Sequence, residues 1–87
     1  MPDGYRVSIL SGAEKELNSL PGVVIGRVAD AIAGLSDNPR PMGCIKLAGT
    51  ESRYRIRVGS YRVLYEIIDG RKLVEVYRIR HRSDVYR

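Results

Sequence analysis

Between residues 53 and 58 the chain alternates strictly between arginine and apolar side chains, in the run Arg53-Tyr54-Arg55-Ile56-Arg57-Val58. A period of two is typical of a β-strand whose faces differ, so the apolar side chains share one face and the three guanidiniums share the other. Gly59-Ser60 suits a two-residue type II′ turn, and residues 61–68 are predicted to form the returning strand. The chain must therefore accommodate an antiparallel hairpin with arginines concentrated on one face.

The predicted turn places Arg57 directly opposite Arg62. Opposed like charges destabilise a sheet by up to about 1 kcal/mol, and nothing local compensates this pair. With Cβ atoms about 5 Å apart, the two guanidiniums could grip one phosphate. The alternative is that long arginines on a solvated face splay apart and keep the sheet from aggregating. The predicted cross-strand partners are Val58–Tyr61, Arg57–Arg62, Arg55–Leu64 and Arg53–Glu66.

A last strand is predicted over residues 72–80, after a turn at Asp69-Gly70. Its register stays open. A two-residue loop places Tyr77 opposite Arg62, whereas a three-residue loop with a bulge places Arg78 there.

The first half of the chain predicts one strand and two helices. Residues 5–10 are predicted to form a strand, and Ser11 and Glu14 fit a capping box that starts a helix ending at Pro21-Gly22. Residues 23–36 predict a second helix with an apolar stripe, and residues 45–47 a short strand. The predicted fold is α+β, a single domain over residues 1–87: an N-terminal strand, an antiparallel two-helix hairpin and a three- to four-stranded antiparallel sheet. The apolar stripe of the second helix consists of Val24, Val28, Ile32 and Leu35.

Positive charge is concentrated in the C-terminal part of the chain. Residues 1–52 hold five Lys or Arg against six Asp or Glu, whereas residues 53–87 hold ten against four. This asymmetry predicts a cationic face that binds a polyanion, and RNA is the first candidate. A single cysteine, Cys44, excludes an internal disulfide and favours the cytoplasm. No signal peptide or membrane span is recognised, so no membrane partner is expected.

The candidate chemical groups are arginines, tyrosines and one histidine, His81. Histidine titrates near neutral pH and could act as a general acid or base, although a lone histidine near a polar tail is also a common surface residue. No metal-ligand cluster and no cofactor motif is present, so no metal or cofactor is expected. Arginines can stabilise the pentavalent phosphorane that forms when a 2′-OH of RNA attacks the neighbouring phosphate. These residues therefore suit metal-independent RNA cleavage.

The segment from Tyr54 to Ile67, together with Arg80-His81-Arg82-Ser83-Asp84-Val85-Tyr86, resembles the RelE/ParE superfamily of type II toxins, closest to its RelE branch. The resemblance covers nearly the whole chain and is specific from about Lys46 onward. It implies a RelE-like fold similar to that of the microbial ribonucleases. It also implies a ribosome-dependent endoribonuclease that cuts the mRNA codon in the A site and inhibits translation.

The resemblance also implies roles for individual residues. Arg62 matches the arginine that contacts the scissile phosphate, Arg80 or His81 the acid/base position, and Tyr86 the tyrosine that orients the nucleophile or stacks on the substrate. Arginine is a poor general base, which shifts weight towards His81. The predicted catalytic residues are Arg57, Arg62, Arg80, His81 and Tyr86. The predicted RNA-binding residues are Arg53, Arg55, Arg78 and Arg82.

The implied partners are a cognate antitoxin, the ribosome with its mRNA, and operator DNA bound only through the toxin–antitoxin complex. Two other functions remain open. A ParE-like toxin would bind and poison DNA gyrase without nuclease activity, and a degenerate toxin would bind only its antitoxin and operator DNA. Because the branches share a fold, the fold cannot separate them.

Overall fold

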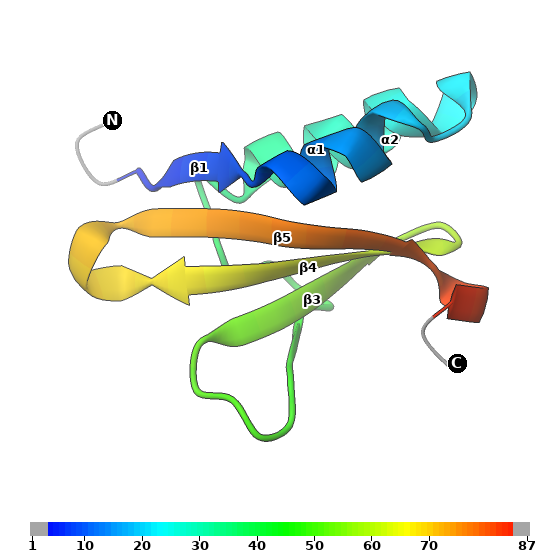
Figure 1. The fold of residues 1–87 in the computed structure, drawn as a ribbon. Helices are drawn as coiled ribbons and strands as arrows, with labels where there is room; N and C mark the ends of the chain where they lie inside the picture. Colours follow the sequence, from blue (N-terminus) through cyan, green and yellow to red (C-terminus); the bar gives the residue numbers. More distant parts are fainter. Residues whose placement is uncertain (1–3, 85–87) are drawn as a thin grey trace.

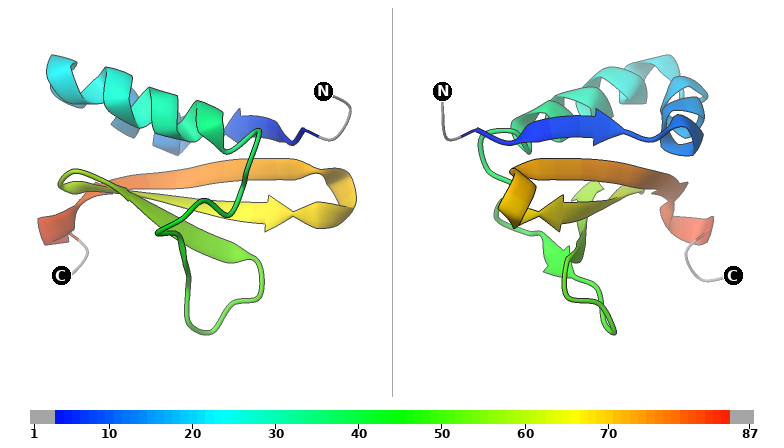
Figure 2. Two further views of the ribbon diagram at one scale, coloured as in Figure 1. Left: turned by 180° about the vertical axis from the view of Figure 1, so that it is seen from behind. Right: turned by 60° about the vertical axis from the view of Figure 1, so that its left-hand side comes forward.

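The computed structural model describes residues 4–84 as two helices stacked on one face of a five-stranded sheet (Figure 1). Views from two further directions show both helices on the same side (Figure 2). The opposite face has no α-helix of the described residues over it. In chain order the elements are β1 (Arg6–Ile9), α1 (Ser11–Asn18), α2 (Gly22–Gly34), β2 (Ile45–Lys46), β3 (Arg53–Val58), β4 (Tyr61–Ile68), the 3-10 turn η1 (Asp69–Arg71), β5 (Leu73–His81) and the 3-10 turn η2 (Arg82–Asp84).

The predicted α+β class is confirmed, but the sheet is larger than expected. Its strand order is β1-β5-β4-β3-β2, and β1 pairs with β5 in parallel. The N-terminal strand was predicted, but its parallel pairing with β5 as a fifth strand of the sheet was not. Parallel pairing needs a long crossover between the strands, and here that crossover runs through both helices and the rest of the sheet.

The β3–β4 hairpin has the predicted register at every position, including Arg57 opposite Arg62 and Arg53 opposite Glu66. Gly59 has a φ of 59°, whereas Ser60 does not have a positive φ. That combination is the one a type II′ turn requires, and glycine adopts it without a steric cost.

Both predicted registers for the last strand are wrong, because Arg80 is the residue opposite Arg62. The β4–β5 connection spans four residues, 69–72, and turns back through Lys72 in the left-handed conformation at φ 47°. A β-bulge then adds one residue to β5, since Tyr65 faces Val76 while Leu64 faces Arg78. The extra residue is Tyr77. The longer loop and the bulge together displace the register beyond either prediction.

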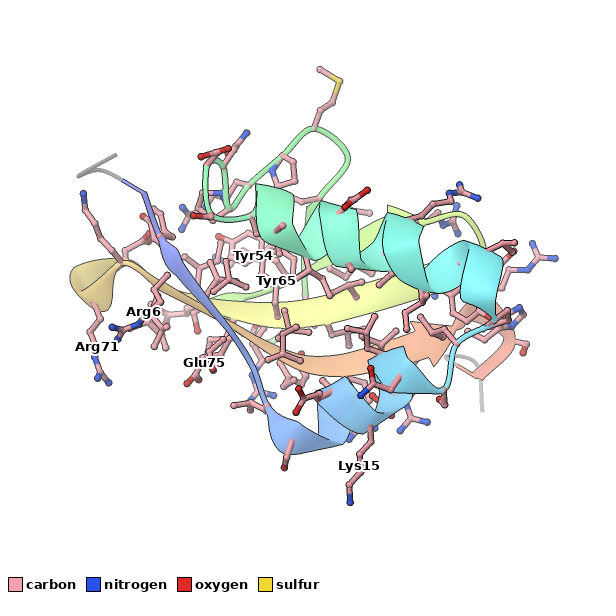
Figure 3. The ribbon with its side chains drawn as sticks, turned by 90° about the horizontal axis from the view of Figure 1, so that it is seen from above. Arg6, Lys15, Tyr54, Tyr65, Arg71 and Glu75 are labelled. Carbon is pink, nitrogen blue, oxygen red and sulfur yellow. The ribbon has the colours of Figure 1, made fainter. Side chains whose placement is uncertain are left out.

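The core lies between the helices and the sheet. Along α2 the predicted stripe is confirmed, with Val28, Ile32 and Leu35 buried and Val24 half-buried. Tyr65 of β4 lies under this helix with no exposed surface, and its ring stacks against Tyr54 at 6.1 Å between centroids (Figure 3). The other buried apolar residues are Ala13, Leu17, Ile56, Val63, Ile67, Leu73, Val74, Val76 and Ile79.

The predicted capping box at Ser11 does not form. The helix α1 begins one residue earlier than expected, so Leu10 occupies the cap position, and its carbonyl accepts the Glu14 N–H at 2.9 Å. A side-chain cap requires non-helical dihedral angles at the capping residue. Ser11 is already helical and therefore cannot provide one.

A polar clamp ties the start of the chain to the β4–β5 turn. Arg40 forms an ion pair with Asp69 at 2.8 Å, and the Tyr5 hydroxyl donates to the same carboxylate at 2.6 Å. Arg40 also donates to the Tyr54 hydroxyl at 3.2 Å. The hydrogen bond from Arg40, which has the larger effect, and the hydrogen bond from Tyr5 hold the pKa of the Asp69 carboxyl below its usual value near 3.8. The clamp joins three segments that are far apart in the sequence.

We expect Asp69→Asn to lower the thermal unfolding midpoint at neutral pH and to have no effect in strong acid. The folded-state pKa of Asp69 is depressed, so the carboxylate stabilises the fold above its unfolded pKa and loses this effect as pH falls through the folded pKa. Circular dichroism melts between pH 7 and pH 2 measure the difference. Asp37→Asn, at an exposed aspartate on a nearby turn, is the control. A difference between wild type and Asp69→Asn that is constant with pH would contradict the assignment.

Candidate RNA-binding face

The sheet face away from the helices presents three rows in which most side chains are charged. Cross-strand partners point to the same side of a sheet, so the register defines each row. The rows run across β3, β4 and β5 and are Arg57–Arg62–Arg80, Arg55–Leu64–Arg78 and Arg53–Glu66–Glu75.

The first row consists of three arginines on adjacent strands. Arg57 is exposed, Arg62 is only 5% exposed, and Arg80 is half-buried. Neighbouring Cβ atoms in such a row are about 5 Å apart. The predicted grouping of Arg57 with Arg62 is confirmed, and the register adds Arg80. The exposed Arg57 and the half-buried Arg80 can donate charge-assisted hydrogen bonds to a phosphate, and Arg62 adds its positive charge between them.

The second row, Arg55–Leu64–Arg78, interleaves cations with apolar side chains. Ile45 of β2 extends it, since it pairs with Arg55 and is 48% exposed. Within residues 4–84, the arginines at positions 55, 57 and 78 make no ion pair and no side-chain hydrogen bond. Three of the six arginines in these rows therefore stay available to an anionic ligand.

The third row carries the carboxylates. Arg53 lies 3.9 Å from Glu66, which also accepts a hydrogen bond from the Ser52 hydroxyl at 2.8 Å. Glu75 adds a second negative charge opposite Glu66. From the first of these rows to the third, the sign of the row's formal charge thus changes from positive to negative.

Sequence reasoning missed two helix residues that lie close to the arginine-bearing strands. Glu16 of α1 accepts the Ile79 N–H at 2.8 Å and lies 3.9 Å from Arg80. It therefore satisfies a backbone N–H at the edge of β5 beyond the end of β1. Arg27 of α2 reaches the hairpin turn, where a Cβ added to Gly59 would lie 3.7 Å from its Nη2. Helix-to-sheet contacts of this kind leave no local sequence signal.

His81 lies apart from the arginine row. It pairs with Tyr61, and alternation places both on the helix-facing side of their strands. The two rings meet edge to face at 5.1 Å. The Ser83 N–H donates to His81 Nδ1 at 3.2 Å, so the proton of the neutral imidazole lies on Nε2. The catalytic role predicted for His81 stays a prediction, and the register does not bring it to Arg57 and Arg62.

The remaining predicted residues lie at the end of the chain. Arg82 is exposed in η2, where its backbone N–H donates to the Ser60 carbonyl at 2.7 Å and holds η2 against the hairpin turn. Tyr86 lies outside the described residues. Among residues 4–84, no group of three or more His, Cys, Asp or Glu could hold a metal ion, and no helix is long and apolar enough to cross a membrane.

Comparison with known proteins supports the resemblance seen in the sequence. Residues 7–86 match the family model of the ParE toxin of the type II toxin-antitoxin system parDE. The toxin RelG of Mycobacterium tuberculosis is 37% identical over 87 residues, covering 95% of this chain and 97% of RelG. The toxin RelE of the same organism is 34% identical over 84 residues, covering 95% and 87%.

Solved structures agree with the sequence comparison. A chain of the archaeal RelE–RelB complex from Pyrococcus horikoshii superimposes with a TM-score of 0.81 at 33% identity, covering 91% of this chain and 96% of that chain. The isolated E. coli toxin RelE superimposes with a TM-score of 0.79 at 28% identity, covering 94% and 90%. The chain therefore belongs to the RelE/ParE superfamily of type II toxins. It is the toxin of a toxin–antitoxin system, and its curated relatives carry RelE-type names.

Proposed function

We propose that this toxin is a ribosome-dependent endoribonuclease that cleaves mRNA codons in the A site and so inhibits translation. The observation that carries the proposal is the row Arg57–Arg62–Arg80 on the sheet face away from the two α-helices, built from three adjacent strands. Three crowded cations cost stability unless an anion accompanies them. Two relatives are named toxin RelG and toxin RelE, which supports the RelE branch of the superfamily over the ParE branch.

In the proposed reaction the 2′-OH of one nucleotide attacks the adjacent phosphorus, and the bond to the 5′-oxygen breaks. Arg57 and Arg62 stabilise the dianionic phosphorane, and Arg80 contacts the same phosphate from the next strand. Arg55 and Arg78 hold the flanking backbone. Such preorganised cations act without a metal ion. The proton transfers to and from the ribose oxygens are assigned to Arg80, His81 and Tyr86 only as predictions.

The proposed partner is an antitoxin that binds the toxin and neutralises it. Solved relatives from P. horikoshii and M. tuberculosis are RelE–RelB and RelBE2 toxin–antitoxin complexes. The net charge of +5 favours an acidic partner. Operator DNA is proposed to be bound only through that complex.

One observation favours a second candidate function. The family model that matches the chain is described as a ParE toxin, which supports the gyrase-binding alternative. A toxin that acts by binding alone does not need three arginines aligned on adjacent strands. The arginine row therefore favours the nuclease.

Pulse-labelling after induction distinguishes the two functions. We expect methionine incorporation to stop before thymidine incorporation, because cleavage of mRNA on the ribosome blocks protein synthesis first. Primer extension on an abundant mRNA should show new 5′ ends within codons. When Arg57→Ala is induced instead, methionine and thymidine incorporation should both continue. Arrest of thymidine incorporation first would contradict the nuclease and support the gyrase-binding alternative.

A further inference from the structure

The β-bulge in β5 turns the Tyr77 side chain towards the arginine-bearing face. Without the bulge, Tyr77 would alternate to the opposite side from Arg78. Instead the Arg53 guanidinium lies over the Tyr77 ring, with its Cζ 4.7 Å from the ring centroid. Arg53 belongs to β3 and Tyr77 to β5, so the arginine reaches across β4 to make this contact.

The contact forms a layered, planar platform. A guanidinium over an aromatic ring is stabilised by the ring quadrupole and leaves the outer face of the guanidinium available for stacking. Arg53 is exposed and Tyr77 is half-buried, so solvent reaches the platform. The second row lies beside it, with Leu64 half-buried and Ile45 48% exposed. Flat, partly apolar surfaces of this kind stack on unpaired RNA bases.

The charge pattern favours a base at this position. Arg53 and Arg57 are four positions apart along β3, a distance of about 13 Å. Over that distance the rows change from three arginines to one arginine with Glu66 and Glu75. Phosphates are attracted to the first row and are not attracted to the last. A nucleotide near the reacting phosphate would therefore place its neutral base, and not its backbone, on the platform.

We propose that Arg53 and Tyr77 form a nucleobase-stacking subsite for a nucleotide close to, but not at, the cleaved linkage. This inference rests on the proposed function, because it takes the arginine row as the phosphate site. The chemical class of the ligand is an unpaired base of single-stranded RNA, and the bulge at Tyr77 is the structural device that creates the subsite. Stacking is tolerant of sequence, so the subsite holds the RNA in register more than it reads the identity of the base.

Binding of a short single-stranded RNA tests this subsite. The probe carries 2′-fluoro groups in place of 2′-OH, so that it cannot be cut, and an abasic residue is placed at each position in turn. We expect the affinity of the wild type, measured by fluorescence anisotropy at low salt, to fall about 5- to 100-fold for one position. That position-specific loss should disappear in Tyr77→Ala and Arg53→Ala.

Two variants act as controls. Tyr77→Phe keeps the ring and should behave as the wild type, and Arg71→Ala removes an exposed arginine outside the face (Figure 3). The inference is overturned if an abasic residue lowers the affinity equally at every position of the probe. It is also overturned if Tyr77→Ala shows the same position-specific loss as the wild type. Failure of the wild type to bind the probe overturns the subsite, whereas the nuclease is judged separately by cleavage of natural mRNA on ribosomes. If the wild type shows a position-specific loss of affinity but leaves natural mRNA on ribosomes uncut, the nuclease is overturned and the subsite is not.

Discussion

Arg62→Ala is expected to lower the rate of mRNA cleavage by about 10²–10³ and to abolish growth arrest, because it removes the central charge of the row. Primer extension on ribosome-bound mRNA measures the rate, and colony formation under induction measures toxicity. Antitoxin binding should remain, since the substitution removes one side chain from a single face. A fully toxic Arg62→Ala protein would refute the assignment of Arg57–Arg62–Arg80 as the phosphate site.

The fold needs a separate check, because Arg62 is only 5% exposed. Arg57→Ala removes an exposed member of the same row and should lower cleavage by a similar factor without a change in the melting temperature. Arg71→Ala, which removes the same charge from η1, should leave cleavage unchanged. Loss of cleavage in Arg62→Ala together with full cleavage in Arg57→Ala would mean that Arg62 acts through the fold.

Tyr65→Ala is expected to destabilise the protein by about 3–5 kcal/mol, as does truncation of other large buried aromatics. Tyr65 has no exposed surface, stacks on Tyr54, and donates its hydroxyl to the Pro39 carbonyl at 2.8 Å. Burial raises the pKa of this phenol above its ordinary value. Domains of this kind have a total stability of about 5–15 kcal/mol, so the variant should be partly unfolded at 37 °C. Urea unfolding followed by circular dichroism gives the difference.

Tyr65→Phe separates the ring from its hydroxyl. It keeps the stack on Tyr54 and should cost only about 1 kcal/mol, the usual contribution of one hydrogen bond. Because the hydroxyl holds Pro39 of the 35–44 connection, the loss should be accompanied by faster proteolysis of that segment. Equal destabilisation by the Ala and Phe variants would show that the hydrogen bond, and not core packing, makes Tyr65 important.

Local patterns predicted local structure well in this chain. The alternation from Arg53 to Val58, joined to Gly59-Ser60, predicted a hairpin register that is confirmed at each pair. The same reasoning failed at β5, because a left-handed Lys72 and a bulge at Tyr77 have no sequence signature comparable to Gly59-Ser60. The parallel β1–β5 pair was missed for a related reason: its partners are more than sixty residues apart, and no turn encodes their register.

The candidate site shows the same division. Arginines on β3 and β4 could be grouped from the hairpin alone, whereas the position of Arg80 depends on the register of β5. The packing of Glu16 against the edge of β5, and of Arg27 beside the hairpin turn, depends on helices that meet the sheet only in the finished fold. His81 was predicted to be catalytic because of its imidazole, but strand alternation places its side chain on the face opposite to the arginine row.

The position of β5 between β1 and β4 has a consequence during synthesis of the chain. Translation produces β1 at one edge of the sheet first, then β2 at the opposite edge, then β3 and β4. It reaches β5, the partner of both β1 and β4, last. Until residues 73–81 leave the ribosome exit tunnel, β1 lacks its partner and the arginine row lacks Arg80. A nascent toxin therefore cannot assemble its full cationic row while most of its length is still being made. That delay gives an antitoxin the opportunity to bind before the toxin is complete.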